Sequence, residues 1–128
     1  MLEPRRIESN VAPKVFEDLG NGNWYYNYGI ESKQVTMAPM GEDDTERTET
    51  RYSYIQIKMT GKPTYKRCVE LVIREYLTQN QEFDLINSYN RAALSLLSDT
   101  EAEKAADDYL NYLHIVSGIK DNIKKDFE

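Results

Sequence analysis

Apolar and polar residues alternate in three short runs of the first half of the chain. Residues 15–19 and 24–30 flank the sequence GNGN, and an Asn-Gly pair suits a tight hairpin turn because it tolerates positive φ. In residues 51–60, Ile55, Ile57 and Met59 alternate with polar positions and Tyr54. The pattern predicts a hairpin and a third, half-buried strand.

Two segments lack such a pattern. Residues 1–13 are polar and contain Pro4 and Pro13, which predicts an extended arm. Residues 36–51 are interrupted by Pro39 and Gly41, and five acidic side chains fall between positions 42 and 49. Residues 43–51 contain no apolar side chain that could anchor them to a core. We therefore predict a mobile loop over about 36–51, above all over 43–51, with partial strand as the alternative, because a structureless loop of this length is uncommon.

From Pro63 onward the apolar period becomes helical. The first helix is predicted to end at TQNQ (78–81), and its apolar stripe is Tyr65, Cys68, Val69, Val72, Ile73 and Tyr76. The second spans about 82–97, with an inward side of Leu85, Ile86, Tyr89, Ala92, Ala93 and Leu96. The third spans about 98–125, with an inward side of Ala105, Tyr109, Tyr112, Leu113, Val116, Ile119 and Ile123. Ser98 and Glu101 have the spacing of a capping box at its start.

Together these elements predict an α+β fold, with a small antiparallel sheet (the hairpin plus a third strand) followed by three helices packed on one face. A length of 128 residues fits a single domain over 1–128 that buries about 70% of its unfolded surface. Within it we expect an arm over 1–13, a sheet part over 14–60 and a helical part over 61–128.

The charge limits the classes of partner. The net charge is −6, and acidic side chains outnumber basic ones in both halves, 10 to 7 in residues 1–60 and 12 to 9 in residues 61–128. Nucleic acids and anionic membranes attract clustered Lys and Arg, so neither is an expected partner. The sequence MLEPRRIESN has no apolar core of a signal peptide, and no apolar run reaches the ~20 residues of a membrane span. We expect a soluble intracellular protein.

The stretch TGKPT (60–64) is the one candidate for a phosphate-binding loop. A Walker A loop needs GxxxxGK[ST], but here Gln56 stands in place of the first glycine and Pro63 in place of the hydroxyl residue. A weaker candidate for anion binding remains in Lys62, Lys66 and Arg67, because cations at a helix start oppose the helix dipole. The alternative is that these side chains are solvated, with Glu70 one turn from Lys66.

No residue pattern predicts catalysis. His114 is the single histidine, and its neighbours four residues away, Leu110 and Gly118, are not metal ligands. Asp107 and Asp108 point about 100° apart on a helix, and Cys68 lies on an apolar stripe where it acts as a small hydrophobe. We therefore predict a protein that is no enzyme and has no cofactor and no metal.

Aromatic residues gather on the predicted sheet. The expected partner-binding residues are Trp24, Tyr26, Tyr28, Tyr52 and Tyr54. A sheet covered on one face exposes the other, and large amphipathic rings are favoured at interfaces, so Tyr26 and Tyr54 are the first expected contacts. The alternative is that tyrosine simply suits strands.

The second half of the chain resembles a known class of proteins. A strand followed by GKPTY, a helix opening YKRCV, the sequence EFDLINSYNRAAL and a long helix ending KKDF resemble small proteins of phage and prophage tail regions, described as tail-fibre assembly or tail accessory proteins. The resemblance covers about residues 50–127. It implies an assembly role in the cytoplasm of a bacterial host or on a virion, and no established active site.

The expected function is therefore a non-enzymatic protein-interaction or assembly-accessory module, with a protein partner or self-association. Two alternatives stay open. One is a small-anion or nucleotide-binding protein that uses the basic start of the first helix. The other is a plain structural subunit with a tyrosine-rich core.

Overall fold

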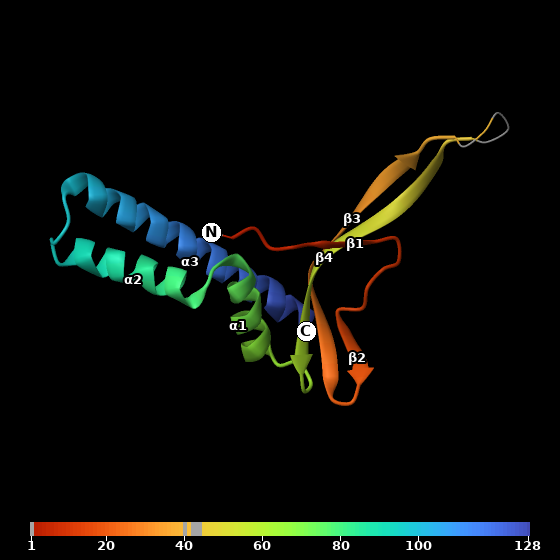
Figure 1. Ribbon diagram of the computed structural model, residues 1–128, viewed down its shortest axis with the longest axis horizontal. Coiled ribbons are helices and arrows are strands. Elements are labelled where there is room, and N and C mark those ends of the chain that lie inside the picture. The colour runs from red at the N-terminus through yellow and green to blue at the C-terminus, as the bar shows by residue number, and fades with distance from the viewer. Residues whose placement is uncertain (1, 40, 42–44) are drawn as a thin grey trace. The chain divides into compact units, whose positions relative to one another are not determined.

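The computed structural model describes residues 2–39, 41 and 45–128. A four-stranded antiparallel sheet, ordered β1-β4-β3-β2, is followed by three helices (Figure 1), which confirms the predicted α+β class with one strand more than expected. The chain divides into two compact units, which we call the sheet unit (Arg5–Thr64) and the helical unit (Tyr65–Glu128 with residues 2–4). The organisation as one domain, with helices packed on one sheet face, stays a prediction.

The predicted hairpin is formed by β2 (Phe16–Gly20) and β3 (Asn23–Met37). Asn21 and Gly22 form the turn with φ of 54° and 76°, and positive φ at both central residues is what a type I′ turn requires. Phe16 pairs with Tyr26, and their rings stack with centroids 5.2 Å apart. The Asn-Gly signal in the sequence therefore located this turn.

The third predicted strand is the second half of β4 (Arg47–Thr60). Tyr26 lies opposite Ile57 and Tyr28 opposite Ile55, so these four side chains share one face. All four are buried. On the other face Asn27 is also buried, where its amide donates to the Lys14 carbonyl (2.6 Å) and its oxygen accepts from Gln56 (3.2 Å). The centre of the sheet is thus covered on both faces.

The predicted arm contains a strand that the sequence pattern missed. Strand β1 (Ile7–Ser9) pairs with β4, with Ile7 opposite Tyr54. Beside it, Arg6 donates to the Ser53 hydroxyl at 2.7 Å and to the Gly29 carbonyl at 2.6 Å. A three-residue strand is too short to show alternation, which is why this segment reads as an arm.

The predicted mobile loop over 36–51 is partly strand, at residues 36–37 and 47–51, which is the alternative that the sequence left open. Residues 33–37 of β3 pair with residues 47–51 of β4 and form a two-stranded ribbon that continues past β1 and β2 (Figure 1). None of its side chains is buried, so no apolar alternation marks it in the sequence. Residues 40 and 42–44 of the predicted loop lie outside the described residues.

The helical unit begins with α1 (Tyr65–Tyr76), which buries Cys68, Val69, Val72 and Ile73 as predicted, whereas Tyr65 is exposed. Helix α2 (Gln79–Ala93) starts earlier than predicted, because TQNQ is a capping box and not a terminator. Thr78 accepts from the Gln81 amide (3.1 Å), and the Gln81 side chain accepts from the Thr78 amide (2.8 Å).

Helix α3 (Asp99–Asp126) begins at the predicted Ser98–Glu101 capping box. Ala105, Tyr112, Ile119 and Ile123 are buried as expected. Leu113 was also expected inside but is exposed, and Leu96 lies beyond the end of α2 and is exposed as well. Helices α2 and α3 lie side by side as an antiparallel pair (Figure 1), which we call the α2–α3 hairpin.

Candidate functional site: the α2–α3 hairpin

The aromatic residues predicted to bind a partner do not form one exposed surface. Tyr26, Tyr28 and Tyr54 are only 0%, 5% and 7% exposed, and Trp24 and Tyr52 are half-buried. The register also separates Tyr26 and Tyr54, because Tyr26 shares a face with Ile57, whose side chain points opposite to that of Tyr54. The prediction that Tyr26 and Tyr54 are exposed contacts is therefore wrong.

The three basic residues predicted to bind an anion belong to different parts of the chain. Lys62 lies near the end of the sheet unit, whereas Lys66 and Arg67 lie in the first turn of α1. This first turn contains no acidic residue. Lys62 and Lys66 are exposed and Arg67 is half-buried. Anion binding by these residues stays a prediction.

The single cysteine is a packing residue. Cys68 is fully buried on α1, and this burial raises the pKa of its thiol to about 11, with Asp126 adding to the increase and Arg67 opposing it. Since the thiolate is the nucleophile, the raised pKa and the burial of this side chain disfavour its reaction.

Neither a metal centre nor a membrane span is found in the described part of the chain. Among those residues, no three His, Cys, Asp or Glu side chains gather closely enough to hold a metal ion. Within the same residues, none of the helices combines the length and apolar character needed to cross a bilayer.

Helix α2 is the unusual element of the helical unit. It has 15 residues, and none of them is buried. Its contact with α3 includes a stack of Tyr89 on Tyr109, with ring centroids 4.4 Å apart and planes 16° apart. Helices in proteins owe most of their stability to packing of an apolar side, and α2 buries no residue on such a side.

A polar anchor joins the three helices at the start of α2. The Tyr112 hydroxyl of α3 donates to Glu82 at 2.6 Å, and Arg74 of α1 donates to the other carboxylate oxygen at 3.0 Å. Burial by itself would raise the pKa of Glu82, but the bonds from Tyr112 and Arg74 and the charge of Arg74 outweigh it and lower that pKa. Burial, followed by the bond to Glu82 and its charge, raises the pKa of Tyr112 to about 12.

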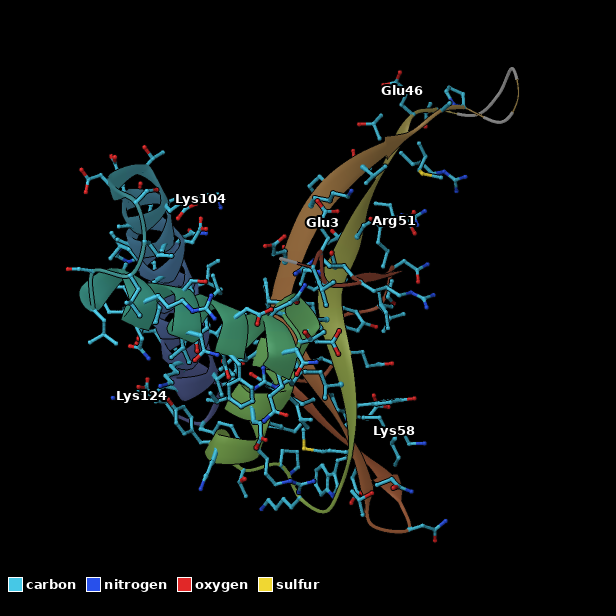
Figure 2. All side chains as sticks on the ribbon, turned by 60° about the vertical axis from the view of Figure 1, so that its left-hand side comes forward. Glu3, Glu46, Arg51, Lys58, Lys104 and Lys124 are labelled. Carbon is cyan, nitrogen blue, oxygen red and sulfur yellow. The ribbon has the colours of Figure 1, made fainter. Side chains whose placement is uncertain are left out.

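One side of the hairpin is a groove of about 420 Å³ with a mixed polar and apolar lining. It is lined by Leu77, Gln81, Asp84, Leu85, Ser88, Ala105, Asp108 and Asn111. Lys104 donates to Asp108 at 2.8 Å, and Figure 2 shows its side chain near the start of α3. This bond raises the pKa of Lys104.

The other side of the hairpin is apolar, and we call it the open side. Helical spacing puts Ile86, Ala106, Leu110 and Leu113 about 80–160° around each helix from the groove residues. Tyr89 and Tyr109 lie between the two sides, about 40° from Leu85 and Ala105. The open side consists of Ile86, Tyr89, Ala106, Tyr109, Leu110 and Leu113. Tyr89, Leu110 and Leu113 are 40%, 54% and 44% exposed, which is high for apolar side chains that lie together.

Sequence reasoning missed this surface because it placed one inward stripe on each helix. Tyr89 and Leu113 were assigned to the core, and Leu110 was assigned to none. The signal was present in the apolar residues that fall outside the stripes, Phe83 and Leu110, both of which are exposed.

Comparison of the chain with known proteins finds no matching family model, no matching curated protein and no matching solved structure.

Proposed function

We propose that this protein is a non-enzymatic protein-interaction module that binds its partner through the open side of the α2–α3 hairpin. One observation carries the proposal, namely that a 15-residue helix with an apolar side has no buried residue. A partner laid on the open side would remove Tyr89, Leu110 and Leu113 from water, and burial of a large apolar side chain stabilises an association by roughly 1.5–3 kcal/mol.

The surface has the composition of a contact site. Aromatic residues are enriched at interfaces, and Tyr89 is already held in place by its stack on Tyr109. A ring fixed before binding loses less conformational freedom when the partner arrives. The open side is therefore suited to binding more than to chemistry, since none of its six side chains is an acid, a base or a nucleophile near neutral pH.

The resemblance to phage and prophage tail accessory proteins supports an assembly role of this kind. It includes EFDLINSYNRAAL, which contributes Ile86 and Tyr89 to the open side. Under this proposal the protein acts in the cytoplasm of a bacterial host or on a virion, as a helper that binds another protein.

The proposal is tested with the double variant Leu110→Ser/Leu113→Ser. Substitutions of exposed residues usually change stability by no more than about 0.5 kcal/mol each, so the thermal midpoint should hardly change. A partner cross-linked to the wild-type protein in its source cells should be lost. The matched control is Val11→Ser/Leu19→Ser, which changes two exposed apolar residues of the sheet unit and should keep that partner.

Two results would contradict the proposal. Retention of the same partner by the Leu110/Leu113 variant would place the contact elsewhere. A large fall in the thermal midpoint would show that these leucines belong to the core.

A further inference from the structure

The charge of the chain is concentrated on the α2–α3 hairpin. Residues 79–117 carry seven acidic and two basic side chains, whereas residues 5–64 carry nine acidic and eight basic ones. The whole hairpin, residues 79–126, carries nine acidic and five basic side chains and so a net charge of −4 within a chain of −6. A partner of this surface meets a strongly negative field.

Acidic side chains occur on both sides of the hairpin, and two of its five cations lie on the groove side. Lys104 is bonded to the groove residue Asp108, and Arg91 lies three residues after the groove residue Ser88, so both cations belong to the groove side. On the other side, Asp99, Glu103 and Asp107 repeat every four residues along α3. We call these three carboxylates the acidic edge.

The acidic edge borders the open side. Glu103 precedes Ala106 by three residues and Asp107 precedes Leu110 by three, and side chains at this spacing are neighbours on a helix surface. All three carboxylates are exposed, and none makes an ion pair or a side-chain hydrogen bond within the described part of the chain. They are available to a partner that covers the leucines.

We propose that the partner element is an amphipathic helix with a basic flank, an inference that rests on the proposed function. Its apolar stripe covers the open side, and Lys or Arg side chains at i, i+4 and i+8 pair with the acidic edge. Asp99 to Leu113 spans about 21 Å at 1.5 Å per residue, so a partner helix of about four turns covers the surface. This is the helix-in-groove mode, with charge fixing the direction and register of the bound helix.

A second copy of this chain fits the surface less well. Its own open side carries the same acidic edge, so a symmetric pair would bring two sets of unpaired carboxylates toward one interface. Like charges close to one another at an interface oppose association.

The test uses three synthetic helical peptides of about 15 residues, a length that spans about four turns. The first has leucines at i, i+3, i+4 and i+7 and lysines along one flank. The second keeps the leucines and has glutamates on that flank, and the third keeps the lysines and has glutamine in place of leucine. Each is titrated into the full chain by fluorescence anisotropy at two salt concentrations.

Only the first peptide should bind well. Exposed ion pairs contribute modestly one by one, so three together should give about a tenfold preference over the glutamate peptide, and this preference should shrink at high salt. The triple variant Asp99→Asn/Glu103→Gln/Asp107→Asn should bind the first peptide about tenfold more weakly and should lose the preference for the lysine peptide over the glutamate peptide. Glu3→Gln/Glu70→Gln/Asp121→Asn changes the net charge equally at exposed sites elsewhere and should bind as the wild type does.

The outcomes separate this inference from the proposed function. Equal binding of the lysine and glutamate peptides, lost in Leu110→Ser/Leu113→Ser, would overturn the basic partner and keep the interaction surface. Dimerisation of the chain through the same leucines, seen by light scattering, would also overturn it by showing that a second copy is the occupant. Failure of all three peptides to bind, together with an unchanged cellular partner in the leucine variant, would overturn both.

Discussion

At the scale of single residues, Glu82 shows how a charge inside the helical unit is held. Its carboxylate lies at the meeting of three helices, where it accepts from Tyr112 at 2.6 Å and from Arg74 at 3.0 Å. A partly buried carboxylate costs free energy unless its oxygens are hydrogen-bonded, and here both are. The anchor fixes the start of α2, the end of the helix that lies nearest to α1.

The first prediction concerns the bond from Tyr112. Tyr112→Phe should lower the free energy of unfolding at pH 7 by about 2 kcal/mol, because a hydrogen bond to a charged group is lost. The folded-state pKa of Glu82 is lowered, so its contribution is present above the unfolded value near 4.5 and is lost as the pH falls through the folded value. The difference between wild type and variant should therefore shrink below about pH 4.5.

The measurement is urea unfolding from pH 3 to pH 7. Tyr109→Phe is the control, since it keeps the ring stack on Tyr89 and has no bond to Glu82. A difference between wild type and Tyr112→Phe that is the same at pH 3 and pH 7 would show that Glu82 is not the acceptor that matters.

At the scale of elements, the ribbon of β3 and β4 is regular although its side chains give no apolar pattern. Val35 pairs with Glu49 and Thr36 with Thr48, and the Gln34 amide donates to the Thr50 hydroxyl at 2.9 Å. Threonine and valine are common in strands because their branched side chains fit a pleated surface. Cross-strand pairs of this kind stabilise the ribbon although neither of its faces is deeply buried.

For this ribbon we expect NMR spectra to show contacts between the two strands, with Val35 near Glu49 and Thr36 near Thr48. The chemical shifts of residues 47–51 should be those of a strand. Random-coil shifts over these residues would restore the mobile loop that the sequence pattern predicts.

The sequence pattern predicted the elements that bury one face and expose the other face to water. The Asn-Gly turn, the alternation of Ile55, Ile57 and Met59, and the capping box at Ser98 located four of the seven elements. The sequence pattern failed for strand residues that are buried on both faces of the sheet and for a helix that buries no residue. Tyr54 is buried on the face opposite Ile57, whereas no residue of α2 is buried, and neither condition can be derived from the period of one segment. Both conditions depend on which other parts of the chain cover the element.

At the scale of the whole molecule, burial and charge are distributed unevenly. The most deeply buried side chains include Tyr26 and Ile55 in the sheet unit and Val72, Leu77 and Ile123 in the helical unit, and none belongs to α2. The hairpin that contains α2 also carries most of the net charge. A surface that is both uncovered and charged is what a binding module presents to its partner, and this combination is the basis of the proposed function.

Native-state hydrogen–deuterium exchange measures how firmly α2, which buries no residue, is held in the isolated chain. Amides of residues 82–93 in α2 should exchange much faster than those around Val72 in α1 and Ile119 in α3, because an element with few buried contacts opens at lower free energy. Protection of α2 equal to that of α1, in a chain shown to be monomeric, would contradict the account.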